Sequence, residues 1–377
     1  MKKLLITTDT FLPKKDGITR FLEQIIPSLT KRFDVTILAP SFTQSFREER
    51  YAGAKVVRFP VFKRFQIASY PPVRFHYRKV KAYVREADLV WIQSAAPLGF
   101  MGLLAARKYK KPVIAYIHSM EWEQLTHVVI TSWLLKAISL RLLAKLERYI
   151  YNKCTLLMVA AESVAAELAA LGIKTRKVII PLGVDGSYFK PTDDKRQAKR
   201  IVKLDQDSIV IGYCGRLSAE KDVGTLAAAV ARLQERYPKL QLLIVGDGNR
   251  RTVTRKVKKN VRITGFVDDV VPYLQAMDIF VLPSLTETSS LATMEAMACG
   301  LPVISTYVGN VKNYITDGKS GYLFPRGDVA YLEKKLARLI ESPELRRAFG
   351  VMARKTMVTR FHWEKTVRQI ENVLGRF

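Results

Sequence analysis

Two glutamates in the second half of the sequence lie at a predicted loop and in the helix that follows it, where both could bind hydroxyls of one ligand. Glu287 and Glu295 are separated by seven residues and follow the apolar run Ile279–Leu282, which predicts a buried strand. A Thr- and Ser-rich loop comes next, and Leu291–Ala298 predicts a helix whose N-cap lies in that loop. Open backbone N–H groups at such a helix start bind phosphate, and the two carboxylates can accept hydrogen bonds from hydroxyls of the same ligand. The spacing alone also fits a capping acid followed by a solvated helix acid.

Two other loops in the same half carry glycine and positive charge directly after predicted strands. Gly215, Arg216 and Lys221 follow one apolar run, and a Gly-Asp-Gly turn beginning at Gly246 follows the next. Glycine lets the backbone turn sharply and approach a ligand, and the two cations attract an anion. Each loop by itself also fits an ordinary turn between a strand and a helix. Because ligands of open parallel sheets bind at the carboxyl ends of the strands, the three loops together predict one phosphate or sugar site.

Short apolar runs alternate with longer amphipathic segments in two series along the chain. The predicted strands are residues 4–7, 35–39, 56–59, 89–93, 113–117, 156–159 and 177–181 in the first series, and 209–214, 240–245, 261–264, 279–282 and 303–306 in the second. Apolar strands separated by helices predict parallel sheets that are covered on both faces. We therefore predict an α/β protein of two doubly wound, Rossmann-like domains, residues 1–190 and 208–356, with a linker over 191–207 and a central cleft.

The composition predicts a soluble and strongly basic protein. Its 377 residues are 48% hydrophobic, which suits two domains, and the net charge of +28 predicts attraction to a polyanion. Cys154, Cys214 and Cys299 lie far apart in apolar contexts, which favours reduced thiols in a cytoplasmic protein. The most apolar long segment, residues 133–146, is interrupted by three cations, so no membrane span is predicted. The first apolar run is too short for a signal peptide and predicts a strand.

Taken together, these motifs resemble the retaining glycosyltransferases of family 4, which have the GT-B fold. The matching residues of the second half are Gly215, Arg216, Lys221, Gly246, Gly248, Gly265, Phe266, Val267, Pro283, Ser284, Glu287, Glu295 and the run Gly300-Leu-Pro-Val303. In the first half, Gly17 lies in the loop after the first predicted strand and His118 follows the fifth. The turn at residues 181–185 and the final helix match as well. The resemblance spans the whole chain and implies that residues 357–377 return to the N-terminal domain.

The resemblance implies transfer of a hexose from a nucleoside diphosphate to an acceptor hydroxyl, with retention of configuration and without a divalent metal. Arg216 and Lys221 would hold the diphosphate, as preorganised cations do. Glu287 would contact the donor sugar and Glu295 the ribose. His118 would orient sugar or acceptor, although it also fits a strand-end histidine satisfied within the fold. The remaining donor contacts would be Gly17, Gly215, Gly246, Gly265, Phe266, Val267, Ser289, Ser290 and Leu291. The donor would be a UDP- or GDP-hexose, and no other cofactor is expected.

The sequence departs from the family pattern at several positions. Asp16 stands where a second glycine is common in the first loop, and Leu182 stands where asparagine is usual in the turn. Ser289 and Ser290 replace the usual Phe-Gly of the glutamate loop, and Asn313 replaces a frequent glutamate. These departures bear on which sugar is transferred, whereas the diphosphate and glutamate residues remain.

Two segments of the N-terminal half organise the positive charge into faces. A helix over residues 73–85 would place four cations on one side, and a second helix over residues 133–153 carries another basic face. Basic amphipathic helices with aromatic edges bind anionic membranes, although each segment also fits a core helix with a solvated cationic back. The residues expected at the acceptor and membrane surface are Lys63, Arg64, Arg74, Arg78, Lys81, Arg85, Trp133, Arg141 and Lys145.

The charge and the donor motifs together predict a peripheral enzyme at the cytoplasmic face of the cell membrane. Its partners would be a nucleotide sugar, a lipid or glycan acceptor and an anionic membrane surface, with the oligomeric state open between monomer and weak dimer. A soluble family member acting on a polysaccharide or small sugar is one alternative, in which the basic surface is incidental. A nucleic-acid-binding protein is the other. It explains the charge but gives the two glutamates no role, and the sequence has no helix-turn-helix, RRM or zinc signature.

Overall fold

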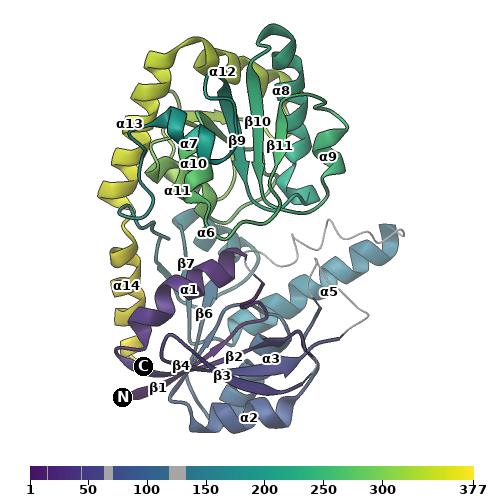
Figure 1. Cartoon of the computed structure of the whole chain (residues 1–377). Coiled ribbons are helices and arrows are strands. Elements are labelled where there is room, and N and C mark those ends of the chain that lie inside the picture. The colour runs from purple at the N-terminus through teal and green to yellow at the C-terminus, as the bar shows by residue number, and fades with distance from the viewer. Residues whose placement is uncertain (15, 44, 63–70, 119–132) are drawn as a thin grey trace. The chain divides into compact units, whose positions relative to one another are not determined.

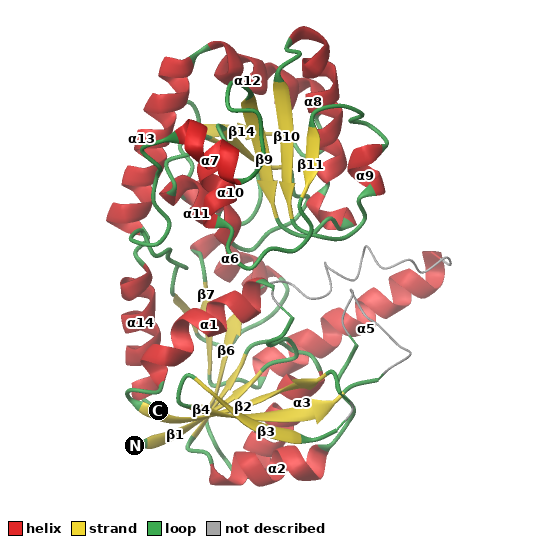
Figure 2. Cartoon of the chain, in the orientation of Figure 1, coloured by secondary structure: helices red, strands yellow, loops and turns green. Residues whose placement is uncertain are grey.

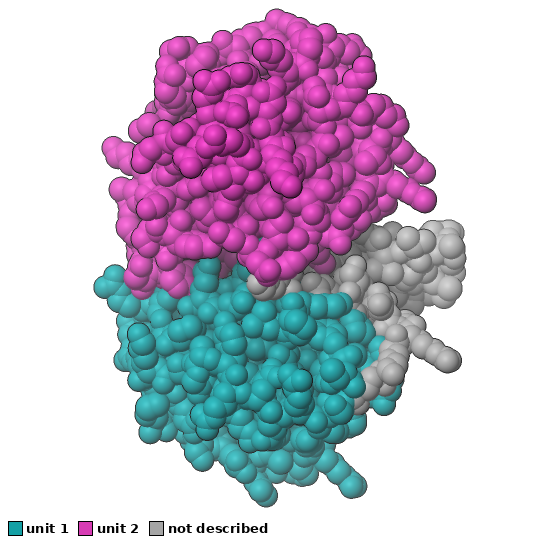
Figure 3. Space-filling model, in the orientation of Figure 1, with its two compact units in different colours: residues 1–181, 367–377 teal, residues 182–366 magenta. Residues whose placement is uncertain are grey.

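The chain divides into two compact units, each an α/β domain with its own sheet (Figures 1 and 2). The structure, a computed structural model, describes the chain apart from residues 15, 44, 63–70 and 119–132, and for residues 133–140 it describes the helical backbone without side chains. Unit 1 contains Met1–Pro181 and Val367–Phe377, and unit 2 contains Leu182–Thr366 (Figure 3). The predicted α/β class with two Rossmann-like parallel sheets is therefore confirmed.

Unit 1 is built on an eight-stranded sheet with the order β3-β4-β2-β1-β5-β6-β7-β8. Its strands are β1 (Lys2–Thr7), β2 (Phe33–Ser41), β3 (Arg47–Tyr51), β4 (Ala54–Pro60), β5 (Leu89–Ile92), β6 (Val113–Ile117), β7 (Leu156–Val159) and β8 (Lys177–Ile179). Its helices include α1 (Gly17–Leu29), α2 (Tyr77–Glu86), α3 (Pro97–Lys108), α5 (Trp133–Asn152) and α6 (Glu162–Ala170). Only β3 and β4 pair antiparallel among these strands, so the carboxyl ends of the other strands lie along one edge of the sheet.

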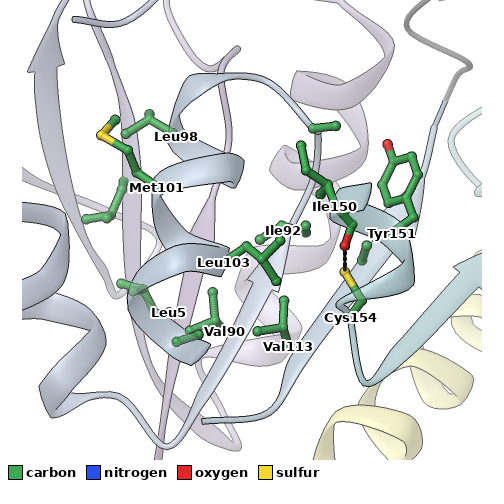
Figure 4. Packing of buried hydrophobic residues seen from close by; sticks show 14 of the residues in the cluster. Leu5, Val90, Ile92, Leu98, Met101, Leu103, Val113, Ile150, Tyr151 and Cys154 are labelled. Atoms are coloured by element: carbon green, nitrogen blue, oxygen red, sulfur yellow. Dashed lines mark hydrogen bonds between the residues drawn. The ribbon is translucent and has the colours of Figure 1, made fainter. Parts of the chain in front are cut away.

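The core of unit 1 contains apolar side chains from the middle strands and from the helices beside them. Figure 4 shows Ile92, Leu103 and Val113 from β5, α3 and β6 in this cluster. All four residues of β5 are buried, as expected for a central parallel strand. The Cys154 thiol donates to the Ile150 carbonyl oxygen at 3.4 Å, and burial raises the pKa of this thiol to about 12. All three cysteines are unpaired and buried in the structure.

Unit 2 is built on a six-stranded, fully parallel sheet with the order β11-β10-β9-β12-β13-β14. Its strands are β9 (Ile209–Cys214), β10 (Leu240–Val245), β11 (Val261–Ile263), β12 (Ile279–Leu282), β13 (Val303–Thr306) and β14 (Gly321–Phe324). Its helices are α7 (Lys195–Ile201), α8 (Val223–Arg236), α9 (Arg251–Thr254), α10 (Val271–Ala276), α11 (Leu291–Ala298), α12 (Val329–Glu341) and α13 (Pro343–Arg360), with the 3-10 turns η1 (Ala219–Lys221) and η2 (Val311–Asn313). The loops after β9, β10 and β12 carry the donor motifs.

The last helix, α14 (Trp363–Gly375), begins in unit 2 and ends in unit 1. Its part beyond residue 366 buries Ile370 and Leu374, and Glu371 forms an ion pair with Arg32 of unit 1 at 3.0 Å. Residues 357–366 were predicted to belong to the N-terminal domain. They are part of unit 2 because α13 continues to residue 360 and packs on α11 and α12.

The segment 191–207, predicted as a linker, is folded onto unit 2. It contains α7, whose first turn is capped by the side chain of Asp194. Lys199 is 5% exposed, and its Nζ lies 2.8 Å from the Asp278 carboxylate and donates to the Ser208 carbonyl oxygen at 2.6 Å. This polar segment packs because its lysine finds acidic and carbonyl partners inside unit 2, which the local sequence pattern does not reveal.

The helix predicted over residues 73–85 begins four residues later than expected. Arg74 lies before α2, in an extended segment where its backbone N–H donates to the Pro60 carbonyl oxygen at 2.8 Å and Val73 bridges to Val61. Residues 73 and 74 therefore pair with the backbone at the end of β4 and do not form part of the helix. Arg74 does not belong to the α2 face, and the prediction that it does is wrong.

Candidate functional site

Three glycines bring together the ends of β9, β10 and β11. Gly215, Gly246 and Gly265 have φ angles of 150°, 143° and 76°, in the region that favours glycine. A Cβ at Gly246 would lie 2.0 Å from the carbonyl oxygen of Gly215, and Gly246 forms an isolated bridge with Gly265. These strand ends therefore present backbone without side chains, a surface that a bulky anion can approach.

Lys221 and Glu287 meet beside these strand ends. The Lys221 Nζ donates to Glu287 Oε1 at 2.7 Å, and the Ser284 hydroxyl donates to the same oxygen at 2.9 Å. The two charged side chains are 19% and 12% exposed. They come from η1 after β9 and from the loop after β12, and the Leu285 N–H holds the two loops together by donating to the Glu220 carbonyl oxygen at 2.8 Å. The pair can exchange partners with a phosphate and a hydroxyl that enter here.

Arg216 stands next to a buried carboxylate. Its Nη2 lies 3.5 Å from Glu220 Oε1, which also accepts a 2.5 Å hydrogen bond from the Ser218 hydroxyl. Burial by itself would raise the pKa of Glu220, but the Ser218 hydrogen bond and the charges of Arg216 and Lys221 leave that pKa below its ordinary value. Glu220 is therefore an anion that anchors one side of the guanidinium. The Arg216 side chain is 38% exposed, so a diphosphate can still reach it.

The loop that carries Glu287 is fixed by a second glycine loop. Gly309 has a φ of 45°, and a Cβ there would lie 1.9 Å from the Glu287 carbonyl oxygen. The Asn310 N–H donates to the Thr288 carbonyl oxygen at 2.9 Å, and the Thr306 hydroxyl donates to the Ser284 carbonyl oxygen at 2.6 Å. The loop position that orients Glu287 therefore depends on backbone contacts from the segment after β13.

The helix predicted after the glutamate loop has the predicted bounds, Leu291–Ala298. Ser290 is its N-cap and accepts the Thr293 N–H at 3.3 Å. Ser289 Oγ is buried and has no hydrogen-bond partner within the described part of the chain. Glu295 lies in the buried face of this helix and is 2% exposed. The two glutamates thus differ in access, since the Glu287 side chain in the loop is 12% exposed and Glu295 is enclosed in the packed helix.

Two further predicted donor residues follow β11. Phe266 is 54% exposed directly after Gly265, and Val267 is half-buried. An exposed aromatic ring at a strand end offers a flat apolar face to a ligand. Unit 2 therefore gathers at one edge of its sheet the glycines, Arg216, Lys221 and the Glu287 loop.

His118 lies at the carboxyl end of β6 in unit 1. Its Nε2 is 2.9 Å from Gln93 Oε1 at the end of the neighbouring strand β5. The rings of Phe21 and Tyr116 pack against it with centroid distances of 4.9 and 4.7 Å. Burial lowers the pKa of His118 to about 3, so the imidazole is neutral at physiological pH. Gln93 was not predicted as a site residue. Its place directly after an apolar strand, at a carboxyl end, was the available signal.

Gly17 and Asp16 begin helix α1 in the same unit. Asp16 is the N-cap and accepts the Thr19 N–H at 2.8 Å and the Thr10 hydroxyl at 2.6 Å. Gly17 is exposed, and a Cβ added to it would meet nothing within 4 Å. The departure from a second glycine at position 16 thus has a local use as a helix cap, and the space beside Gly17 is open to a ligand.

Asp9 is a further acidic residue of this strand-end region, and the sequence pattern does not indicate a role for it. It accepts the Ser94 hydroxyl at 3.0 Å and the Leu98 N–H at 3.1 Å, in the first turn of α3. Burial raises its pKa to about 6, against the lowering effect of these hydrogen bonds. Its observed contacts make it a support for the start of α3.

The predicted membrane residues fall into three groups. Arg78 and Arg85 are exposed on α2, Lys81 is half-buried between them, and the buried residues of this helix, Val80 and Val84, lie on its other side. Arg74, Arg141 and Lys145 are exposed on other segments, whereas Lys63 and Arg64 and the side chain of Trp133 lie outside the described residues.

In the described ranges no helix is long and apolar enough to cross a membrane. The same ranges contain no group of three His, Cys, Asp or Glu side chains arranged to hold a metal ion.

Models of known families match most of the chain. Residues 15–188 match the model described as Glycosyltransferase Family 4, and residues 208–342 match Glycosyl transferases group 1. The chain is 27% identical to a GDP-mannose-dependent monoacylated alpha-(1-6)-phosphatidylinositol monomannoside mannosyltransferase of Corynebacterium glutamicum, over 99% of this chain and 98% of the relative. It is 26% identical to the alpha-monoglucosyldiacylglycerol synthase of Acholeplasma laidlawii, over 96% and 93%.

Solved structures have the same fold. Sucrose-phosphate synthase from Thermosynechococcus elongatus superposes with a TM-score of 0.83 at 20% identity, over 100% of this chain and 99% of the other. HepE of Anabaena in complex with UDP-glucose superposes with a TM-score of 0.80 at 19% identity, over 100% of both chains. The similarity covers both units and shows the two-domain GT-B class of fold.

Proposed function

The chain belongs to glycosyltransferase family 4 and is a hexosyltransferase, and on that premise we propose that it transfers the hexose of UDP- or GDP-hexose to a membrane lipid with retention of configuration. The observation that carries the proposal is the Lys221–Glu287 pair at the glycine-lined strand ends of unit 2. A cation that can bind the diphosphate and a carboxylate that can accept hydrogen bonds from the sugar stand side by side there.

The donor groups divide the work between charge and orientation. Arg216 and Lys221 stabilise the negative charge that develops on the leaving diphosphate, because both cations stand at the strand ends, paired with Glu220 and Glu287, before the donor arrives. Open N–H groups at the start of α11 bind a phosphate, and Glu287 accepts hydrogen bonds from sugar hydroxyls. Glu295 accepts from the ribose. The two cations supply the charge that a divalent metal supplies elsewhere, so the proposed reaction proceeds without one.

The proposed acceptor is a lipid with a sugar, glycerol or inositol hydroxyl at the membrane surface. Two relatives that align along nearly the whole chain are named for such lipids, one a phosphatidylinositol mannoside and the other a glucosyldiacylglycerol. The cationic side of α2 supports membrane contact, since Arg78, Lys81 and Arg85 lie three and four residues apart. Phe75 beside this helix is 61% exposed, as an interfacial anchor is. The enzyme then works as a peripheral protein on the inner face of the cell membrane.

Vesicle flotation together with transfer assays tests the acceptor proposal. Arg78, Lys81 and Arg85 changed together to Glu should lower binding to anionic vesicles by about tenfold or more, since each basic residue contributes about 1 kcal/mol near such a surface. Transfer to lipid should fall with it, while stabilisation by UDP- or GDP-hexose stays unchanged.

A matched control changes three exposed cations of unit 2, Arg255, Lys258 and Lys259, to Glu. This control should bind vesicles more tightly than the α2 variant. Equal loss in both variants would show that overall charge, and not α2, governs binding. Transfer to a soluble glycan with none to lipid extracts would overturn the lipid acceptor and leave a transferase that acts on soluble sugars.

A further inference from the structure

The hydrogen bond between Gln93 and His118 fixes which nitrogen of the imidazole carries the proton. An amide oxygen only accepts hydrogen bonds, so with Oε1 of Gln93 facing His118 Nε2 at 2.9 Å the imidazole donates from Nε2. In this orientation the amide nitrogen of Gln93 is buried without a partner among the described residues. The other nitrogen, Nδ1, then has a free lone pair and is an acceptor. Within the described residues, no hydrogen bond to Nδ1 is found. The geometry thus leaves one ring nitrogen as an acceptor for a ligand.

We infer that Gln93 is a positioning residue that holds His118 as the Nε2-protonated tautomer, so that Nδ1 accepts a hydrogen bond from a hydroxyl of a sugar ligand bound at this strand edge of unit 1. The inference rests on the proposed function, because it assumes that His118 meets the reacting sugars. Gln93 acts through His118 and is not itself expected to touch the reacting atoms.

The surroundings of the ring favour this arrangement over a charged one. Phe21 from α1 packs edge-on against His118, and Tyr116 lies 4.7 Å from it with its hydroxyl donating to the Ile180 carbonyl oxygen at 2.9 Å. Tyr116 is the titratable group among these neighbours, and burial keeps it neutral by raising its pKa. The lowered pKa of His118 comes from burial alone. A carboxylate at position 93 would stabilise the imidazolium, whereas an amide orients the ring and leaves it neutral.

Gln93 is itself built into the fold. It is 2% exposed, and its backbone N–H donates to the Thr7 carbonyl oxygen at 3.0 Å, which ties it to β1. β5 and β6 are neighbours in the parallel sheet, with Ile92 opposite Ala115, so residues 93 and 118 leave adjacent strands at the same edge. Burial and this backbone bond limit the freedom of Gln93, so its amide oxygen can orient the imidazole.

Nitrogen NMR of the histidines tests the tautomer without any assay of activity. The chain has four histidines, and the His118 signals are assigned by their loss in His118→Asn. The proposal expects Nε2 with the shift of a protonated nitrogen and Nδ1 with that of a bare one at neutral pH. In Gln93→Met the two forms should mix. The opposite tautomer in the wild type, or an unchanged spectrum in Gln93→Met, would overturn the inference.

Activity profiles test the positioning role. Gln93→Met should lower kcat/KM by about 10- to 100-fold, which is the effect of removing a hydrogen-bond partner that orients a metal-binding histidine. Gln93→Glu keeps an acceptor for Nε2–H and should be close to wild type at alkaline pH. Its carboxylate raises the pKa of His118, so its kcat/KM should fall as the pH falls through the new value. A Gln93→Glu variant that loses activity equally at all pH values would overturn the role.

A matched control and two assays separate the sources of failure. Gln241 on β10 is also a glutamine with a buried amide oxygen, and Gln241→Met should leave both the spectrum and the activity unchanged. If the hydroxyl belongs to the donor sugar, Gln93→Met slows donor hydrolysis and transfer alike. If it belongs to the acceptor, only transfer slows. Absence of transfer by the wild type would refute the proposed function, while the NMR result would still decide the tautomer.

Discussion

Lys221 and Glu287 neutralise each other in unit 2, and donor binding must redistribute this charge. Their side chains are only 19% and 12% exposed, so water solvates both charges poorly and each is stabilised by the other. A diphosphate that arrives beside Lys221 offers more negative charge than one carboxylate does. We expect the lysine to turn toward the phosphate while Ser284 keeps its hydrogen bond to Glu287. Glu287 then accepts from a sugar hydroxyl, and the ion pair is exchanged for two contacts with the donor.

Replacing Lys221 by Ala should lower turnover by about 10²- to 10³-fold, the usual effect of losing one preorganised group that stabilises developing charge. Glu287→Ala should have an effect of similar size. The double variant should lose less than the product of the two, because each single change leaves the other charge buried without its partner. Initial rates at saturating donor measure this.

Lys239→Ala, which removes an exposed lysine of unit 2, serves as the control and should retain full activity. Circular dichroism checks that the fold of each variant is intact. Near-normal turnover in either single variant, or strictly multiplicative losses in the double variant, would contradict the assigned pairing.

The chemistry of single residues was predictable where it depends on the local sequence. The Lys221 and Glu287 loops were found because glycine, cations and carboxylates follow apolar runs at strand ends. Their contact with each other was not predicted, since it depends on how the loops after β9 and β12 approach. Gln93 was predicted as the last residue of a strand, because it directly follows the apolar run of residues 89–92. Its partner is set by the pairing of β5 with β6, which a pattern along the chain does not encode.

Several buried strands were predictable from their apolar runs, whereas β14 (Gly321–Phe324), which is also fully buried, was missed. β6, β7, β9, β10, β12 and β13 have the predicted bounds, because each is an apolar run between polar loops. β3 (Arg47–Tyr51) was missed, since it is a charged, mostly exposed edge strand. Arg58 of β4 holds it through a 2.6 Å ion pair with Glu49. Edge strands of this kind carry charge that discourages pairing with other chains. Because of this charge they contain no apolar run that would predict a strand.

Gly309→Ala tests whether the element after β13 positions Glu287. A Cβ there meets the carbonyl oxygens of Glu287 and Thr288 at 1.9 and 2.7 Å, and the φ of 45° is unfavourable for alanine. The Glu287 loop must shift, so kcat should fall by about 10-fold or more, and unfolding should become easier by about 1–3 kcal/mol. Initial rates and thermal unfolding measure the two effects.

Gly318→Ala is the matched control for backbone strain. Gly318 has a φ of 72°, and a Cβ there meets nothing within 4 Å. This variant should be destabilised to a smaller extent and keep its activity. Equal kcat in the two variants would mean that the contact between Gly309 and the Glu287 loop does not orient the carboxylate.

At the scale of the molecule, the sequence predicted two sheets but not their limits. Two series of apolar runs imply two parallel sheets, and the structure has eight and six strands. The division of the chain after residues 181 and 366 depends on packing between distant segments. Net charge is different, because it is a sum over the sequence and needs no fold. Its consequences for stability and binding can therefore be derived from composition.

The charge of +28 makes the folded protein repel itself. The Debye length falls from about 30 Å to about 6 Å as ionic strength rises from about 10 mM to about 300 mM, so added salt screens this repulsion within each unit. The Tm of the wild type should therefore rise by a few degrees over this range. The variant with Arg78, Lys81 and Arg85 changed to Glu should respond less, because it carries less excess charge. Vesicle binding by the wild type should weaken over the same range. A Tm that falls with salt would show that specific ion pairs outweigh the excess charge. Equal responses in both proteins would show that the excess charge does not set the salt dependence.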